Sequence, residues 1–133
     1  MSQMRQFLFF AITGTIGFVV DSTVLYAMAD YLGWYGARCA SFLTAASATW
    51  AINRKITFQE EGIKQSLAHE YLKYIASMLG GAVVNFSIYI LTINTTQSTS
   101  APLIGVAAGS LGGLFFNFVA AKHIVFKKTK KSE

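Results

Sequence analysis

The chain has 133 residues, of which 53% are hydrophobic and only 13% are charged, and its formal net charge at pH 7 is +5. This length allows one domain of ordinary size, and the balance is too apolar for a soluble globular protein. No nucleic-acid-binding motif accompanies the basic charge, so we expect a membrane protein and no nucleic-acid partner.

Four apolar stretches follow one another along the chain, and we expect each to form a transmembrane helix. A helix needs about 20 mostly apolar residues to cross the roughly 30 Å hydrocarbon core, and residues 7–29, 71–93 and 101–121 reach this length. Residues 37–52 are fewer and rich in Ala, Ser and Thr, so alone they also fit a buried or re-entrant helix. With polar ends included, the helices are predicted at about residues 7–29, 37–56, 71–93 and 101–123.

Lys and Arg residues fall almost entirely on one side of these four spans. Positive charge near helix ends is retained in the cytoplasm, and Arg38 is alone on the opposite side. The cations on the predicted cytoplasmic side are Arg5, Arg54, Lys55, Lys64, Lys73, Lys122, Lys127, Lys128, Lys130 and Lys131. This bias requires an even number of crossings and predicts cytoplasmic N and C termini. The C-terminal lysines also suit anionic headgroups of membrane lipids.

The chain contains an internal repeat, with halves at residues 1–58 and 65–128. A shift of 64 residues lays the first helix on the third, and a shift of 68 lays the second on the fourth. Matched positions include Phe10 with Tyr74, Gly17 with Gly81, Asp21 with Asn85, Thr49 with Asn117, Arg54 with Lys122, and Phe58 with Phe126. Because each half contains two crossings, the halves point the same way through the membrane. The sequence thus predicts an all-α membrane protein in which residues 1–133 form a single domain of four transmembrane helices, arranged as two parallel two-helix repeats.

Small residues recur every four positions in the second and fourth helices, for example at Gly105, Gly109 and Gly113. Such stripes let helix backbones pack closely within a membrane. Asn53 and Asn117 end these stripes near the cytoplasmic side, where an amide can contact a headgroup or a neighbouring helix.

Asp21 is the one acidic residue well inside a predicted span. A carboxylate at the bilayer centre costs about 2.5–3.5 kcal/mol on insertion scales, so it should face the bundle, take a proton or have a partner. The repeat offers Asn85 as that partner. A polar substrate path or a proton-coupling group is one interpretation, and a structural hydrogen bond between helices is the other.

The second and fourth helices end in matching cationic segments, residues 49–58 and 117–126. Each contains a polar residue, an aromatic residue, a cation and a Phe at the same spacing. Basic side chains at headgroup level can bind a phosphate. The alternative is positive-inside anchoring, with Phe58 and Phe126 in the membrane interface.

The sequence gives no sign of enzyme chemistry. Cys39, His69 and His123 do not have metal-ligand spacing, and no nucleophile, base and orienting group can be assigned. We therefore expect no catalytic residues, no metal and no cofactor.

Over nearly its whole length the chain resembles the GtrA-like family of small four-helix membrane proteins. The resemblance rests on residues 5–10 (Arg-Gln-Phe-Leu-Phe-Phe) followed by Gly14 and Gly17, on residues 53–58 (Asn-Arg-Lys-Ile-Thr-Phe), and on residues 122–126 (Lys-His-Ile-Val-Phe). It implies a multi-pass protein of the bacterial inner (plasma) membrane. It also implies flipping of a polyprenyl-phosphate-linked sugar, typically on undecaprenyl phosphate, to the outer leaflet. There the sugar serves O-antigen, teichoic-acid or other polysaccharide synthesis in the cell envelope.

This resemblance assigns two sets of site residues. The lipid phosphate would be bound by Arg54, Lys55, Lys122, Arg5 and Lys73. The polar path, or the coupling of transport to a proton, would use Asp21, Asn85, Asn53 and Asn117. Because four short helices enclose little volume, we expect a homodimer.

Two other functions fit the sequence. A small proton-coupled multidrug exporter would also carry one carboxylate in its first helix, but the cationic endings suit an anionic lipid and would repel a cationic drug. A non-transporting scaffold for a membrane glycosyltransferase would make Arg54 and Lys122 protein contacts.

Overall fold

The computed structural model describes residues 1–59 and 65–127 of the chain, and each regular element in those ranges is a helix. The elements are α1 (Gln3–Ile52), the short π-helix η1 (Asn53–Thr57), α2 (Leu67–Thr95), α3 (Ala101–Ala120) and the π-helix η3 (Ala121–Val125). The all-α prediction is confirmed for these residues. Lys64, Lys128, Lys130 and Lys131 lie outside the described residues, so the predictions made for them stay predictions.

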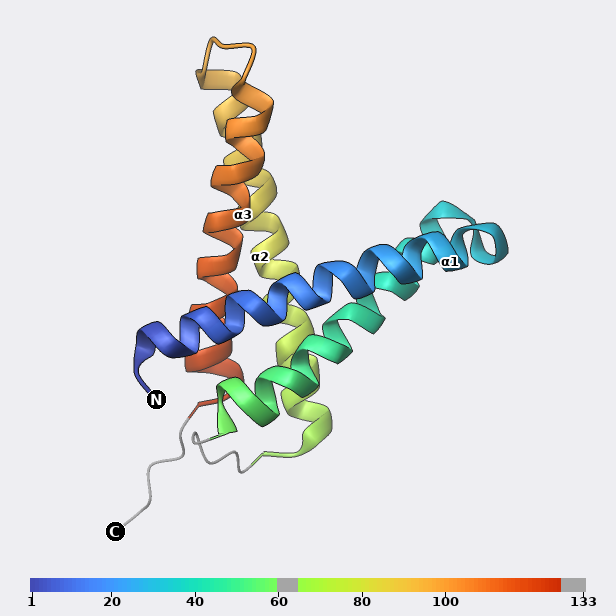
Figure 1. The fold of residues 1–133 in the computed structure, drawn as a ribbon, viewed down its shortest axis with the longest axis vertical. Coiled ribbons are helices and arrows are strands. Elements are labelled where there is room, and N and C mark those ends of the chain that lie inside the picture. The colour runs from blue at the N-terminus through green and yellow to red at the C-terminus, as the bar shows by residue number, and fades with distance from the viewer. Residues whose placement is uncertain (60–64, 128–133) are drawn as a thin grey trace.

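Helix α1 reverses direction at Gly33, which divides it into arm 1A (residues 3–32) and arm 1B (residues 34–52). Gly33 has φ 70° and ψ 168°, a conformation that glycine adopts readily because it has no Cβ. The two arms run back alongside each other, as the blue and green parts of α1 show in Figure 1. Residues 37–52 are therefore helical, as predicted.

Three helical stretches are long and apolar enough to cross a membrane: Gln3–Thr57, Leu67–Thr95 and Ala101–Val125. The first contains both arms of α1. Large side chains such as Val83 and Leu111 are exposed, which fits contact with lipid. The count of four crossings and the cytoplasmic location of the termini stay predictions.

The two halves of the chain form two helical hairpins that meet at one end (Figure 1). Arms 1A and 1B cross the α2–α3 hairpin near the end that carries the N terminus, and the turn at Gly33 lies far from the turn between α2 and α3. Within the second hairpin the glycine stripe packs closely: a Cβ at Gly109 would lie 2.6 Å from the carbonyl oxygen of Asn85, and one at Gly113 would lie 3.0 Å from that of Gly81. This close approach agrees with the packing role predicted for the stripe.

The core lies where the hairpins meet, and an aromatic pair from the two halves is at its centre. Phe58 and Phe126 are completely buried and stack with ring centroids 4.8 Å apart and planes 14° apart. Phe10 packs edge-on against both Phe58 and Phe118, at centroid distances of 6.2 Å and 5.7 Å. Because Phe58 and Phe126 are matched by the repeat, their stack joins equivalent positions of the two halves. The alternative that placed them in the membrane interface is wrong.

Both phenylalanines reach the core from the same backbone feature. The Phe58 N–H donates to the carbonyl of Asn53 (2.9 Å), and the Phe126 N–H donates to the carbonyl of Ala121 (2.8 Å). These are bonds across five residues, so each helix widens into a π turn in its last turn. The widened turn occurs at repeat-matched positions, and it brings both rings to the junction of the hairpins.

Truncating the stacked pair should weaken the fold strongly. We expect Phe58→Ala to lower the free energy of unfolding by about 3–5 kcal/mol, because it removes a fully buried ring and leaves a cavity. The matched control is Phe115→Ala, whose ring is 63% exposed and which should cost less than about 1 kcal/mol. Equilibrium unfolding of the detergent-solubilised protein measures both, and equal effects would contradict a core at this stack.

Candidate functional site

An open cleft of about 590 Å³ lies between the two hairpins. Both arms of α1, together with α2 and α3, line it with mostly small and apolar residues. Its charged and amide-bearing lining residues are Asp21, Arg38, Asn85 and Asn117. Three of the four polar-path candidates thus share one cleft between the halves of the repeat.

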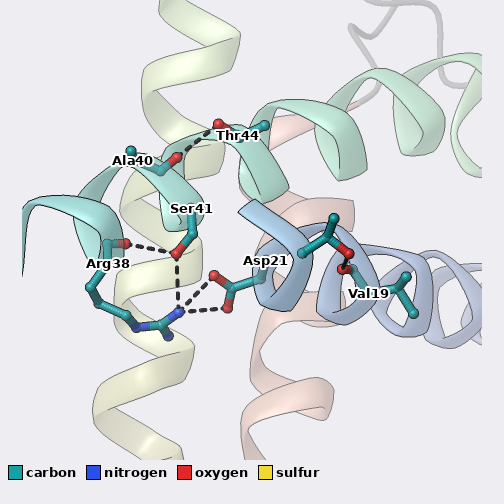
Figure 2. A network of polar contacts seen from close by, with 7 residues as sticks. Val19, Asp21, Arg38, Ala40, Ser41 and Thr44 are labelled. Carbon is teal, nitrogen blue, oxygen red and sulfur yellow. Dashed lines mark hydrogen bonds and ion pairs between the residues drawn. The ribbon is translucent and has the colours of Figure 1, made fainter. Parts of the chain in front are cut away.

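Asp21 on arm 1A is bound by Arg38 on arm 1B, as Figure 2 shows. The Arg38 Nη1 lies 2.6 Å and 2.7 Å from the two carboxylate oxygens. The same nitrogen is 3.5 Å from the hydroxyl of Ser41, which itself donates to the carbonyl of Arg38 at 3.0 Å. The prediction that Asn85 is the partner of Asp21 is therefore wrong. The reversal at Gly33 brings a full positive charge from arm 1B within reach, and a cation pairs with a carboxylate more strongly than an amide does.

The Asn117 side chain occupies a hole left by Gly81. A Cβ at position 81 would overlap the Asn117 amide, and the matched first-half position, Gly17, accommodates Thr49 in the same way, with 2.5 Å between a Cβ there and the threonine Cγ2. Thr49 in the first half is thus equivalent to Asn117 in the second half: each side chain fills the hole at a glycine of the neighbouring helix. Both glycines allow a polar side chain at the cleft wall to sit between helices.

The two polar side chains differ in their hydrogen bonds. The Tyr74 hydroxyl donates to Thr49 at 3.0 Å, whereas the repeat-matched position of Tyr74 is Phe10, which has no hydroxyl. Among the described residues, the buried Asn117 Oδ1 has no hydrogen-bond partner. This oxygen is the Asn117 atom closest to the position that a Cβ at Gly81 would take, so it lies in the glycine hole between the helices.

Asn53, the fourth polar-path candidate, belongs to the junction of the hairpins and is not among the residues that line the cleft. It is buried, its Nδ2 donates to the Tyr74 hydroxyl (2.9 Å), and its Oδ1 accepts from Thr57 (2.9 Å). This network connects η1 to α2. The structure thus gives Asn53 contacts to neighbouring helices, which was one of its two predicted roles.

The five phosphate-binding candidates share the end of the molecule at which the hairpins meet. They are Arg5, Arg54, Lys55, Lys73 and Lys122, and none of these described residues lines the cleft. Lys55 is exposed, as is Arg5. Three of the five contact uncharged groups. Lys73 Nζ lies 3.2 Å from Gln65 Oε1, Lys122 Nζ lies 5.9 Å from the centroid of the Phe118 ring, and the Arg5 guanidinium lies 5.7 Å from the centroid of the Phe9 ring.

Glu70 is a buried carboxylate that was not among the predicted site residues. It is completely buried in the first turn of α2, where its Oε1 accepts from the Trp50 Nε1 at 2.8 Å and lies 3.2 Å from the Arg54 Nε. Its Oε2 has no hydrogen-bond partner within residues 1–59 and 65–127. The sequence carries no signal for this burial; the 64-residue shift only matches Glu70 with Gln6, which the structure also buries.

Comparison with known proteins finds a family match. The family described as GtrA/DPMS, transmembrane domain, matches residues 9–132, and no curated protein matches the chain. The matched range contains every polar residue of the cleft and both cationic helix endings. The family resemblance seen in the sequence is confirmed.

Neutralising Glu70 should weaken the contacts by which it joins the hairpins, those with Trp50 and Arg54. In Glu70→Gln the side-chain carbonyl still accepts from Trp50, but Arg54 loses its carboxylate. We expect the free energy of unfolding to fall by about 1–2 kcal/mol, less than for a fully buried pair, because the Arg54 side chain is 28% exposed. The control Asp30→Asn removes an exposed carboxylate from arm 1A and should have no effect, and an unchanged Glu70→Gln variant would contradict this role of Glu70.

Proposed function

The chain belongs to the GtrA/DPMS transmembrane-domain family, and from this membership and the cleft between its halves we propose that it flips a polyprenyl-phosphate-linked sugar. The family makes it a membrane protein of glycosyl-lipid handling. The proposed substrate is an undecaprenyl-phosphate sugar, moved from the cytoplasmic to the outer leaflet of the bacterial inner membrane for cell-surface polysaccharide synthesis.

The proposed topology has four crossings with both termini in the cytoplasm. The reversal at Gly33 supports it, because it gives each half of the repeat two antiparallel helices. The shared end of Arg5, Arg54, Lys55 and Lys122 supports it as well, since a single cationic end is what the positive-inside rule requires.

The observation that carries the proposal is a small set of charged and amide side chains inside an otherwise apolar cleft between the hairpins. A sugar is rich in hydroxyl groups, and Asn85 and Asn117 offer amide groups to such a ligand inside the cleft. The isoprenoid tail of the lipid can stay in the bilayer beside the exposed apolar faces. The sugar therefore crosses along the cleft while the tail never leaves hydrocarbon.

The cationic end is proposed to capture the phosphate from the cytoplasmic leaflet. Lys55 and Lys122 carry no carboxylate contact among the described residues, whereas Arg54 shares its charge with Glu70. A phosphate therefore meets the two lysines directly and has to compete with Glu70 for Arg54.

The multidrug-exporter alternative is less well supported. A cationic drug needs a carboxylate that is free to bind it, and Asp21 already binds Arg38 in the cleft. The scaffold alternative, with a membrane glycosyltransferase as partner, is an outcome of the test below.

Reconstituted liposomes test the proposal directly. Purified protein should move a fluorescent undecaprenyl-phosphate sugar between leaflets faster than empty liposomes do. The double variant Lys55→Gln with Lys122→Gln should slow the initial rate by about tenfold, because two charge-assisted contacts to the phosphate are lost. The control Lys127→Gln removes another exposed cation and should keep the rate.

Failure in this assay would have a clear meaning. If the wild-type protein moved no lipid above empty liposomes yet retained a membrane glycosyltransferase on a column, the scaffold function would replace flipping. If the double variant were as fast as the wild type, the two lysines would be anchors only.

A homodimer is proposed because one chain provides only a shallow, open cleft for a sugar phosphate. Light scattering coupled to size-exclusion chromatography should give a protein mass in detergent of twice that of one chain. A monomeric species that is active in liposomes would contradict the proposal.

A further inference from the structure

The cleft between the hairpins contains one cation that no predicted phosphate site includes. In the part of the chain that the structure describes, Arg38 is the single Lys or Arg residue that lines the cleft. Its side chain is 57% exposed. The five candidate phosphate ligands lie at the other end of the helices, so a phosphate inside the cleft would meet Arg38.

The Arg38 guanidinium keeps donors available in the presence of Asp21. Its recorded contacts to Asp21 and Ser41 all use Nη1. A guanidinium has five N–H donors on three nitrogens, so Nη2 and Nε remain free among the described residues. Two such donors form a planar fork that matches the oxygens of a phosphate.

The charges at this pair fit an exchange of anions. A cation without a partner inside a membrane span is costly, and Asp21 provides that partner when no ligand is present. A sugar-phosphate diester of a polyprenyl lipid carries one negative charge, the same as the carboxylate. Binding of the diester to Arg38 can therefore replace or share the contact with Asp21 without leaving the guanidinium unpaired.

We propose that Arg38 is a second binding site for the lipid phosphate, inside the cleft, and that Asp21 is the internal anion that competes with the phosphate for it. This inference rests on the proposed function. At about 1.5 Å per helical residue, residues 38 and 54 lie about 24 Å apart along the helix. The two sites are thus separated by most of the hydrocarbon thickness.

Binding to matched variants tests the competition. Purified protein in detergent is titrated with undecaprenyl phosphate, and the bound fraction is read by native mass spectrometry. Asp21→Asn should bind several-fold more tightly, because its amide competes less well for Arg38. Arg38→Gln should bind about tenfold more weakly, and Arg38→Lys should fall between Arg38→Gln and the wild type, because lysine keeps the charge and loses the fork.

The double variant separates a binding role from a structural one. Asp21→Asn with Arg38→Gln should bind as weakly as Arg38→Gln alone, since the phosphate ligand is missing in both. Asp30→Asn makes the same charge change on the same arm, outside the cleft, and should bind like the wild type. If both single variants bound weakly and the double variant recovered, the pair would be structural and the inference overturned.

Control lipids identify the chemical group that is bound, and they separate the failure of this inference from the failure of the proposed function. Neutral polyprenol should not respond to the variants, and phosphatidylglycerol should respond less than undecaprenyl phosphate. Equal responses to both phosphate lipids would overturn the assignment to a polyprenyl substrate. If wild-type and Arg38→Gln proteins bound undecaprenyl phosphate equally and flipped its sugar equally, this inference would fail while the proposed function stood. If the wild-type protein bound neither undecaprenyl phosphate nor its sugar-linked form, both would fail.

Discussion

The stack of Phe58 on Phe126 is the contact on which the rest of the arrangement depends. Each ring is completely buried and comes from the widened last turn of a helix in a different half, so the stack joins the two hairpins near their shared end. The hairpins are joined there and diverge beyond it (Figure 1), and the cleft lies between them. The cleft with Asp21 and Arg38 is a consequence of this one-sided junction.

The duplication preserved the packing of the two halves and changed their polar groups. Glycine holes at Gly17 and Gly81 accept a side chain from the neighbouring helix in both halves. The inserted side chain is Thr49 in one half and Asn117 in the other, and the hydroxyl of Tyr74 is missing from Phe10. The same rule holds for Glu70 with Gln6, and for Asp21 with Asn85. The two glycine holes are thus the same in both halves, while the polar side chains near them differ.

Sequence reasoning reached the helices because hydropathy and periodicity are local properties. The repeat supported residues 37–52 as a helix, since their match to the fourth helix extends through the cationic ending. The pairing of Asp21 with Arg38 and the burial of Glu70 were missed, because both depend on where the reversal at Gly33 and the crossing of the hairpins bring distant residues together. Asn53 was placed with the polar path because it ends the stripe of small residues in the second predicted helix. Only the packing of Tyr74 shows that its amide is already used.

Two guanidinium groups, one at each proposed phosphate site, have their own carboxylate: Arg54 with Glu70 and Arg38 with Asp21. An anionic substrate therefore exchanges one anion for another at both places and does not meet a bare charge. Exchange lowers the affinity of each site, and a carrier needs sites that are strong enough to be entered and weak enough to be left. The structure also makes the two exchanges unequal, because Glu70 is fully buried and Asp21 is partly exposed. Under the proposed function, a phosphate would displace the partly exposed Asp21 more easily than the buried Glu70.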